Sequence, residues 1–463
     1  MGKMKKRFVI TVVLAVCFAF TTSGKKVTAG NCDLCSPVSC QTGCPAGCRT
    51  DSLGSYLYDK SIFDSPLFEN CLIGKKSKTG IVFYGWMLTG VTVNNHGSTT
   101  THVDKDSAQE YNNRRDSQGN RVRDSMADNS GNTYVLMLEQ PTEWKVNQLW
   151  FGAKKDLDDH LGVGFQSDFT YGTDGRYSRN HGDRSFDYHW GSGDYFASFT
   201  QLYGTVGTKD LFVKVGKFAG GFSYEGMAAP REYFYTHANI CYGRPLTAHG
   251  AMLEWRPNKK WMLTGGWLAG VFNSFDNPYG DSAFLGKATY NFTNNVSLTY
   301  KIFYNDRGPR PLPGQVFPLQ SSGQIDAINT LIFTWKINKC WSYMGEIAYN
   351  EGHLHRPPDK LENHAWGINN HLIRTFSEKF SVGLRGEYHY SHASAFDNRG
   401  ITGGQGGDLW QFTLASHYKI TPKTTFRPEI RYDYANYRNG YRPFGGESKN
   451  DQVCGGVSFI VLF

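Results

Sequence analysis

The densest group of residues that could do chemistry is a run of cysteines near the start of the chain. The stretch NCDLCSPVSCQTGCPAGC contains five of them and a sixth follows, giving Cys32, Cys35, Cys40, Cys44, Cys48 and Cys71. A Cys-x-x-Cys spacing can bind zinc. However, no second such pair follows at zinc-ribbon distance, the segment has no histidine, and no Cys-x-x-Cys-His haem motif occurs. In an exported chain this pattern is typical of disulfides, so we expect disulfides here and no cofactor.

A second group that could do chemistry consists of histidines in the last third of the chain. His371, His389 and His417 fall on the polar side of alternating stretches, and Ser381 and Asp433 are candidate partners. A hydrolase would need a nucleophile, a base and an orienting group within hydrogen-bond reach. No hydrolase serine motif accompanies these histidines. A hydrolase is therefore the weaker alternative, and no catalytic residue is assigned.

The composition indicates sheets with one apolar and one solvated face. The 463 residues are 40% hydrophobic and 15% aromatic, include 52 glycines, and have a mean hydropathy of −0.47. The net charge is +8, but the Lys and Arg residues are scattered singly along the chain. A nucleic-acid binder would gather its basic residues into a patch or stripe. We therefore expect no nucleic-acid partner.

The N-terminus predicts export. The basic stretch KMKKR precedes an apolar run from Phe8 to Phe20, and the small residues of Val27-Thr28-Ala29 offer a cleavage site. This is the layout of a secretory signal peptide. We therefore divide the chain into a signal peptide at 1–29, a Cys-rich periplasmic leader at 30–78 and a single large domain at 79–463. Nothing in the mature chain resembles the roughly 18 apolar residues of a membrane helix.

From Lys78 onward, apolar and polar residues alternate with period two. In FSVGLRGEYHY (380–390), TFRPEIRYDY (425–434) and VSLTYKIFY (296–304), aromatic and aliphatic residues share one face, and charged residues share the other. This period is that of a strand that is solvated on one side. The domain is therefore predicted to be all-β.

Tight turns and long polar loops separate these strands in strict alternation. Turns fall at 158–159, 208–209, 257–259, 293–295, 338–339, 377–378 and 421–423, and long loops at 94–145, 173–195, 219–245, 271–282, 305–325, 351–362, 391–407 and 435–450. Tryptophans and phenylalanines flank the turns, as in the aromatic girdles of membrane barrels. We predict a transmembrane antiparallel β-barrel with short periplasmic turns and long extracellular loops.

The predicted barrel has about sixteen strands. The stretch TYVLMLEQ (133–140) is unassigned, so 14 to 18 strands stay open. An even number places both termini on the periplasmic side. A barrel of about sixteen strands is wide enough for an aqueous channel, and such barrels are often trimers, which makes a homotrimer our expectation by analogy.

Several stretches resemble a known family. QLYGTVGTKDLFVKVGKFAGGFSYEGMAAPREYFYTHANICYGRPLTAHGAMLEWRPNKKW, GGWLAGVF, TFRPEIRYDY and the ending DQVCGGVSFIVLF are similar to the OmpL-like β-barrel porins of planctomycete-type bacteria. The resemblance covers most of 79–463. It implies an outer-membrane channel and supplies no catalytic residues, and the polar loop 94–132 matches no pattern of the family.

The charged residues of the polar strand faces would line such a channel. The basic ones are Lys214, Arg256, Lys287, Lys301, Lys336, Arg385, Lys419, Arg427 and Arg431, and the acidic ones are Asp168, Glu254, Glu346, Glu387, Glu429 and Asp433. The small cationic excess predicts a weak anion preference. Arg385, Arg427 and Arg431 could form a basic ladder. Alternatively, Arg427 with Glu429 and Arg431 with Asp433 are mutually neutralising pairs.

Loop 219–245 is the candidate constriction. It carries charged residues and tyrosines that include Glu225, Arg231, Glu232, Tyr233, Tyr235 and Arg244. A solvated loop is not usually so aromatic, and folding into the lumen would give these rings a surface to pack on. Packing between subunits of an oligomer is the alternative.

The chain ends on an apolar strand, VCGGVSFIVLF. Phe459, Val461 and Phe463 share a face that would meet lipid, and we interpret them as the signal that barrels present to their assembly machinery. Ile460 and Leu462 interrupt the alternation, which we attribute to a position near the rim. The chain can end in mid-strand if the last strand closes the barrel against the first.

These observations favour a porin for passive diffusion of small hydrophilic solutes and ions. One alternative is a structural barrel whose leader binds the cell wall, and the other is the hydrolase already described. Stepwise conductance in a planar bilayer separates the first from both alternatives.

Overall fold

The computed structural model describes most of the predicted barrel. The described residues are 75–76, 79–96, 135, 138, 142–179, 186–187, 190–192, 194–241, 244, 246–271, 275, 282–306, 325–356, 359–392, 406–445 and 448–463. By its contacts the chain divides into two units, 1–47 and 48–463, and all described residues belong to the second. The predicted signal peptide and the six N-terminal cysteines lie outside the described residues, so the expected disulfides and leader stay predictions.

Sixteen long strands make up the second unit. They are β2 (Val82–Asn94), β3 (Lys145–Lys155), β4 (Gly162–Gly172), β6 (Tyr195–Gly207), β7 (Leu211–Ala219), β8 (Thr247–Trp255), β9 (Trp261–Val271), β10 (Ser282–Thr293), β11 (Val296–Asp306), β12 (Ile325–Lys336), β13 (Trp341–Arg356), β14 (Asp359–Thr375), β15 (Phe380–Ser391), β16 (Gly407–Thr421), β17 (Thr424–Tyr437) and β18 (Asp451–Leu462). The two-residue strands β1 (Lys75–Lys76) and β5 (Gly191–Ser192) pair with β2 and β6. The short helices are α3 (Gly175–Ser178), η1 (Ala229–Arg231), η2 (Asn239–Cys241) and η5 (Arg438–Gly440), and no described helix is long and apolar enough to cross a bilayer.

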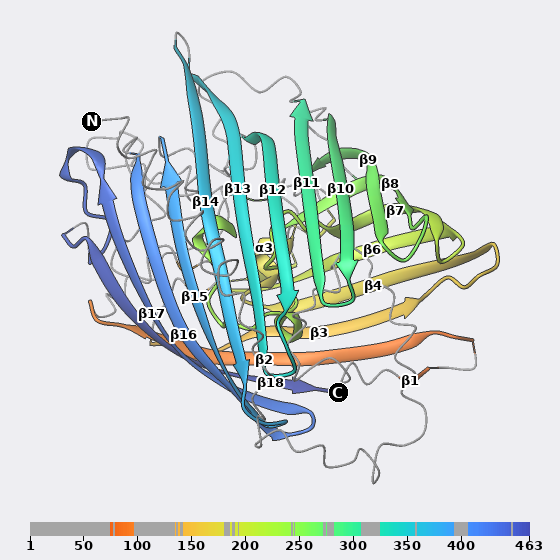
Figure 1. The fold of residues 1–463 in the computed structure, drawn as a ribbon, viewed down its shortest axis with the longest axis horizontal. Coiled ribbons are helices and arrows are strands. Elements are labelled where there is room, and N and C mark those ends of the chain that lie inside the picture. The colour runs from red at the N-terminus through yellow and green to blue at the C-terminus, as the bar shows by residue number, and fades with distance from the viewer. Residues whose placement is uncertain are drawn as a thin grey trace, which may run out of the picture. The chain divides into compact units, whose positions relative to one another are not determined.

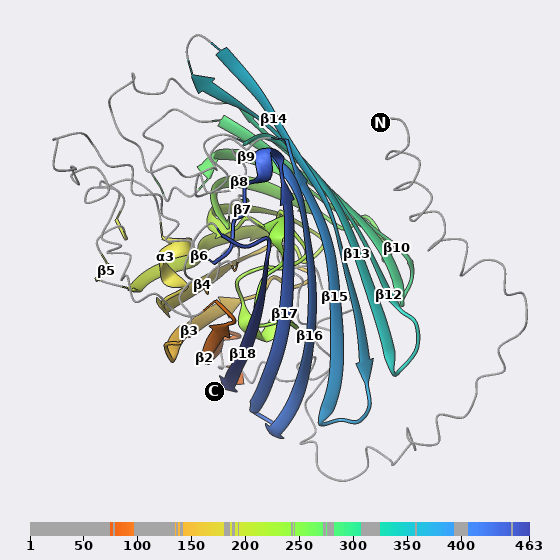
Figure 2. The ribbon, with the colours of Figure 1, turned by 90° about the vertical axis from the view of Figure 1, so that its left-hand side faces the viewer.

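The sixteen strands form one closed antiparallel sheet (Figures 1 and 2). Each strand pairs with its neighbours in the chain, and β18 pairs with β2 in the register Phe459 opposite Thr89. Closure gives every strand two partners and leaves no open sheet edge. The prediction of about sixteen antiparallel strands, with the last closing against the first, is confirmed.

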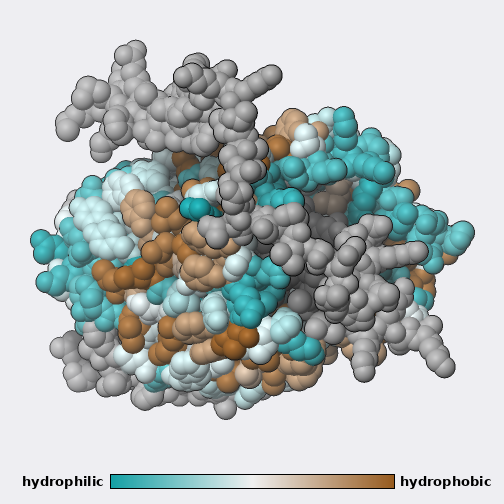
Figure 3. All heavy atoms as spheres, turned by 60° about the horizontal axis from the view of Figure 1, so that its bottom comes forward, coloured by the Kyte–Doolittle hydropathy of each residue, from teal (hydrophilic) through white to brown (hydrophobic). Residues whose placement is uncertain are grey.

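Side chains alternate across the barrel wall as the period-two pattern predicts. On β15 and β17, Arg385 and Arg431 are fully buried inside the barrel, whereas Leu384 and Ile430 are 48% and 53% exposed on its outside. Figure 3 shows apolar residues gathered on the outer wall, with hydrophilic residues toward its margins. The apolar face is therefore the face available to lipid.

The short connections repeat one local device. At the β8–β9 turn, Asn258 Oδ1 accepts hydrogen bonds from the amides of Lys260 and Trp261. At the β12–β13 turn, Asn338 Oδ1 accepts from the corresponding two amides. An Asn side chain that bonds amides two and three residues ahead fixes a tight turn, and Ser377 Oγ does the same at the β14–β15 turn, so these predicted turns are found where their polar residues stand.

One predicted loop is wrong. We expected a loop at 351–362. Instead, β13 continues to Arg356 and β14 begins at Asp359, and these two residues pair across the hairpin. In Figure 2 this hairpin extends beyond its neighbours. Outside the membrane a strand needs backbone pairing but no apolar face toward lipid. The alternation of apolar and polar residues in the sequence therefore ends before the paired strands end.

Aromatic residues mark the turn end of the barrel. Trp255 and Trp261 are each more than 40% exposed, and the ring of Trp261 lies 4.7 Å from that of Tyr290. Phe376 is similarly exposed and packs on Phe380 at 5.6 Å. Exposed aromatic rings at one level of the wall agree with the predicted interfacial girdle.

The last strand combines a lipid face with an apolar inner face. Val453, Val457 and Val461 are partly exposed outward, and Phe463 exchanges both backbone hydrogen bonds with Gly85. Ile460 is fully buried inside the barrel. Its inward neighbour is Leu462, and both belong to an apolar cluster with Trp86, Leu88, Val135, Leu138 and Trp150. Ile460 and Leu462 lie next to the β16–β17 turn, as the predicted rim position implies, and they break the alternation because they pack inside the lumen.

Candidate pore constriction

The connection between β7 and β8, residues 220–246, lies inside the barrel and is called the lumen loop here. Its described residues from Phe222 to Cys241 are almost all buried, although only η1 and η2 give it regular structure. A loop without regular structure carries backbone N–H and C=O groups that need partners when they are buried. Most of those partners are charged side chains of the wall.

Three wall carboxylates accept hydrogen bonds from the N–H groups of the loop. Glu387 accepts from the amides of Asn239, at 2.6 Å, and of Ile240. Glu429 accepts from the amides of Tyr235, at 2.8 Å, and Thr236, at 3.2 Å. In the same manner Glu346, on β13, accepts from Ser223 Oγ at 2.9 Å and from the Tyr224 amide at 3.2 Å. Each carboxylate therefore binds two consecutive residues of the loop.

Three wall arginines donate to the carbonyl groups of the loop. Arg385 Nη1 lies 2.6 Å from Thr236 O, Arg427 Nη1 lies 2.8 Å from Glu232 O, and Arg431 Nη1 lies 2.7 Å from His237 O. Arg385 and Arg431 stand opposite the same residue, Thr413 of β16, so they form one row across three strands. Two of the three arginines of the anticipated basic ladder, Arg385 and Arg431, therefore share a row, Arg427 lies outside it, and all three bind the loop.

The two neutralising pairs considered from the sequence differ in outcome. Arg431 Nη2 lies 2.8 Å from Asp433 Oδ1, which is an ion pair between two fully buried side chains. In the other pair, both carboxylate oxygens of Glu429 accept hydrogen bonds from amides of the loop, and Arg427 Nε donates to Ser458 Oγ at 3.1 Å. Only Arg431 and Asp433 therefore form the neutralising contact that the spacing suggests.

Glu225 is the charged centre of the loop. Its carboxylate lies 2.8 Å from Arg385 Nη1, 3.2 Å from His371 Nε2 and 3.5 Å from His237 Nδ1. Burial acts to raise the pKa of this carboxyl, but Arg385 and the two histidines hold it well below its usual range. The nearby Glu232 has a pKa well above its usual range, because it is buried and lies close to Glu225.

Two tyrosines of the loop, Tyr233 and Tyr235, dock on separate parts of the wall, β15–β16 and β2–β3, where the wall carries glycine. Tyr233 stacks on His417 at 4.0 Å, and its hydroxyl bonds Ser381 at 2.9 Å, beside Gly383. Tyr235 reaches Asn147 of β3 at 2.9 Å through its hydroxyl, beside Gly90. A Cβ at Gly383 or Gly90 would collide with the tyrosine ring or hydroxyl. The wall is therefore shaped to receive the loop.

The remaining predicted residues divide between the loop and the turn end. Arg244 bonds Phe222 O at 2.8 Å and pairs with Glu346 at 3.0 Å, and Lys301 bonds Ser223 O at 3.0 Å. Arg231 lies in η1 and is partly exposed. Arg256 lies outside the constriction, because it follows β8 at a turn, where it pairs with Glu254 and bonds Lys209 O at 3.2 Å.

Three of the residues weighed for a hydrolase, Ser381, His417 and His371, contact the loop. Ser381 bonds the Tyr233 hydroxyl, and His417 Nε2 lies 2.5 Å from Tyr233 O. Sequence reasoning missed Gln148 of β3, whose Nε2 lies 2.6 Å from Met227 O, as well as His237. The sequence pattern does place Gln148 on the polar face of a strand. That pattern gives no indication of which residue the Gln148 side chain contacts.

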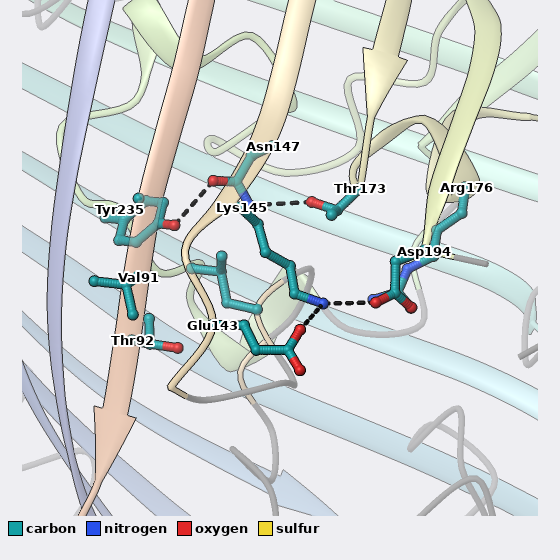
Figure 4. A pocket seen from close by; sticks show the side chains of 11 residues that line it. Val91, Thr92, Glu143, Lys145, Asn147, Thr173, Arg176, Asp194 and Tyr235 are labelled. Atoms are coloured by element: carbon teal, nitrogen blue, oxygen red, sulfur yellow. Dashed lines mark hydrogen bonds and ion pairs between the residues drawn. The ribbon is translucent and has the colours of Figure 1, made fainter. Parts of the chain in front are cut away.

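A polar cavity lies beside Tyr235 and is called the outer cavity here. It lies between β2, β3 and the residues that follow β4. Lys145 Nζ lies in it between the carboxylates of Glu143, at 2.8 Å, and Asp194, at 2.6 Å, as Figure 4 shows. Arg176 also lines this space. Charges of both signs therefore face the outer cavity.

A second cavity, the inner cavity, lies on the other side of Tyr235. Its lining includes Glu232 and His237 of the loop. Both cavities are lined by Leu138, Asn147 and Tyr235. The Tyr235–Asn147 hydrogen bond therefore stands where the two cavities meet.

Solved structures share this fold. The outer membrane channel DcaP of Acinetobacter baumannii is 11% identical, with a TM-score of 0.50 over 84% of this chain and 99% of that one. The anion-selective porin from Comamonas acidovorans is 10% identical, with a TM-score of 0.50 over 83% and 99%. OmpT, an outer membrane protein of Vibrio cholerae, is 10% identical, with a TM-score of 0.50 over 84% and 100%. At these identities the similarity is one of fold.

Comparison with protein families is more specific. No match is found among curated proteins. The family model described as "Putative beta-barrel porin-2, OmpL-like" matches residues 110–463, which is most of the chain and nearly all of the barrel. With sixteen strands closed around a loop that is bonded to the inner wall, the protein belongs to the OmpL-like β-barrel porin family and is an outer-membrane porin.

Proposed function

We propose that this porin conducts small hydrophilic solutes and ions by passive diffusion, and that the lumen loop is its constriction. The observation that carries the proposal is the set of bonds from Glu346, Glu387 and Glu429 to consecutive residues of the loop. A segment held by several buried charged hydrogen bonds stays in the lumen and narrows it. Pore diameter and wall charge then determine what passes.

We propose a weak anion preference. It is supported by the cationic excess on the wet strand faces and by Lys145 and Arg176 in the outer cavity. The preference is weak because the loop occupies the strongest cations, Arg385 and Arg431, and because Glu143 and Asp194 flank Lys145.

The test is single-channel recording of the purified porin in a planar bilayer, with a salt gradient for the reversal potential. We expect stepwise conductance and a modest shift toward the anion potential. Lys145→Gln should move the reversal potential toward cations, whereas Lys209→Gln, an exposed turn lysine paired with Asp159, should not. A folded barrel that never conducts would contradict the channel, and a cation preference of the unmodified porin would contradict the charge assignment.

We further propose that the chain is exported by the signal peptide at 1–29, is inserted by the barrel assembly machinery and forms a trimer in outer-membrane lipid. The apolar outer face and terminal Phe463 support insertion, and the trimer follows by analogy with other porins of this size. Light scattering of the detergent-extracted porin should give three chains per particle. A single chain per particle would contradict the trimer without affecting conduction.

A further inference from the structure

Four buried side chains with metal-binding groups converge in the lumen loop. Glu225, Glu232 and His237 each offer one ligand atom, and these three atoms all lie within 4.8 Å of one another. His371 of β14 joins them, because its Nε2 lies 3.2 Å from Glu225 Oε1. All four residues are more than nine-tenths buried. Two carboxylates and one imidazole of the loop therefore gather around one point, and a second imidazole, that of His371, approaches from the wall through its contact with Glu225.

The spacing is that of ligands around one cation. In a tetrahedral site with bonds of roughly 2.0–2.1 Å, neighbouring ligand atoms are about 3.3 Å apart. Glu225 lies 3.2 Å from His371 Nε2 and 3.5 Å from His237 Nδ1, one contact to each of its oxygens. Despite its 3.2 Å distance from Glu225, His371 Nε2 makes no hydrogen bond of acceptable geometry in the described structure. A metal ion would give this buried nitrogen the partner that it lacks.

The charges of the cluster also favour a cation. Arg385 pairs with Glu225 at 2.8 Å and remains beside the site, so it offsets one carboxylate. Within the described part of the chain, Glu232 has no ion-pair partner, and its one polar contact is the Gly226 amide at 2.6 Å. A buried carboxylate is stable when it is paired or when it binds a metal. A divalent ion between Glu232, Glu225 and the histidines would supply that partner.

The cluster is open to a small ion through the inner cavity. Glu232 and His237 both line this small cavity, and Tyr235 lines both it and the outer cavity. A metal ion that sheds its water shell could therefore approach along the β2–β3 wall. A site with ligands and an entry path meets the structural requirements for metal binding.

We propose that Glu225, Glu232 and His237 bind one divalent transition-metal ion and that His371 completes the ligand set from β14 when the ion is bound, with Zn²⁺ as the best match to two imidazole nitrogens and two carboxylates. The bound ion joins the loop to β14, in addition to the hydrogen bonds that already hold it. This site is independent of the solute that the porin conducts.

The direct test uses the folded, full-length porin, freed of metal with a chelator and titrated with Zn²⁺ by calorimetry. We expect one ion per chain and a higher unfolding temperature when it is bound. Glu232→Gln and His237→Gln should each weaken binding by more than about 100-fold, because loss of a ligand exceeds the loss of a supporting contact. Co²⁺ in place of Zn²⁺ should give the strong visible absorption of a tetrahedral centre.

Two matched controls keep the test decisive. His249→Gln changes a buried lumen histidine outside the cluster, and His160→Gln changes an exposed turn histidine, and neither should alter the affinity. Heat-modifiable migration on a gel verifies that each variant is folded. Failure of the folded wild type to bind Zn²⁺, or unchanged binding in both cluster variants, would overturn the proposal while leaving conductance untouched.

Discussion

The lumen face of β13–β17 and the lumen face around β18, β2 and β3 are both covered by loop residues, but through different chemistry. On β15 and β17, Arg385, Glu387 and Arg431 bind the backbone of the lumen loop through charged hydrogen bonds. Around β2 and β18, Trp86 and Ile460 belong to one apolar cluster with Val135 and Leu138, and the polar bonds of this face come from neutral side chains such as Gln148 and Asn147.

The difference shows how a barrel wall selects what lies on it. A loop that enters as bare backbone brings N–H and C=O groups, and it needs charged partners. A segment that enters with aliphatic side chains needs only apolar surface. The inward face of a barrel strand is thus not polar along its whole length. Four substitutions test how far the two inner surfaces differ.

The largest effect is expected from Arg385→Ala. The guanidinium bonds Thr236 O at 2.6 Å and Glu225 at 2.8 Å, and its loss leaves the buried Glu225 without its cation. Breaking a buried pair in this way costs about 3–5 kcal/mol. We expect a lower urea midpoint in detergent and noisier, larger conductance steps as the loop loosens.

Arg374→Ala is the matched control. Arg374 is exposed on the outer face, where its guanidinium lies 4.5 Å from the ring centroid of Phe376. Its loss should cost about 1 kcal/mol or less and leave the conductance unchanged. Equal effects of the two arginine substitutions would show that the inward contacts of Arg385 do not hold the loop.

On the apolar side, Ile460→Ala should cost about 2–4 kcal/mol, because it leaves a cavity beside Trp86 and Trp150. Val461→Ala, one residue further on the same strand, faces outward and should cost about 1 kcal/mol or less, since lipid or detergent tails can fill the space. Urea unfolding of both variants measures the difference. If Val461→Ala is the more destabilising of the two, Ile460 does not belong to a packed inner surface.

These two surfaces were only partly predictable from the sequence. The period of two placed Arg385, Arg431 and Glu387 on the inner face, because it depends on each strand alone. It could not indicate that they bind Thr236, His237 and Asn239, since docking of the loop depends on three-dimensional fit between segments far apart in the chain.

The exceptions to the pattern were the informative signals. Ile460 breaks the alternation of the last strand because it packs inside the barrel. Gly383, on a wet face, has no side chain of its own because Tyr233 occupies that space. Conversely, the alternation in the sequence ends before β13 and β14 end, because the strand ends next to the Arg356–Asp359 hairpin pair through their backbones and do not follow the alternation.

Asp174, which follows β4 and bonds Gln148 of β3, gives a smaller, pH-dependent effect. Burial raises its pKa to about 6, against hydrogen bonds such as that from Gln148 Nε2 at 2.7 Å. Ionising a carboxyl whose pKa is raised by burial lowers the free energy of unfolding. The stability contribution of Asp174 therefore falls as the pH rises through about 6. Below about pH 4 the carboxyl is protonated in both states, and this loss is absent.

Asp174→Asn removes that charge. We expect a gain of about 1–2 kcal/mol near pH 8, less than the full pKa shift implies because Asn keeps only one acceptor oxygen, and no gain near pH 4. Urea unfolding at both pH values, with a chelator present, checks the sign. A gain of the same size at both would mean that the ionisation of Asp174 is not its cause.

The smallest effect on stability is expected where the chain ends. Phe463 exchanges two backbone bonds with Gly85, and its ring lies 5.6 Å from that of Phe151, but its side chain is 45% exposed. Its deletion should therefore shift the unfolding free energy by about 1 kcal/mol or less.

If the assembly machinery recognises Phe459, Val461 and Phe463 as a signal, the same deletion should sharply lower the amount of heat-modifiable porin in the outer membrane. Deletion of a loop residue of similar exposure, Phe275, is the control for general effects of chain shortening. Normal insertion of the chain lacking Phe463 would show that its exposed ring serves only the lipid face, like the outward residues elsewhere on the barrel.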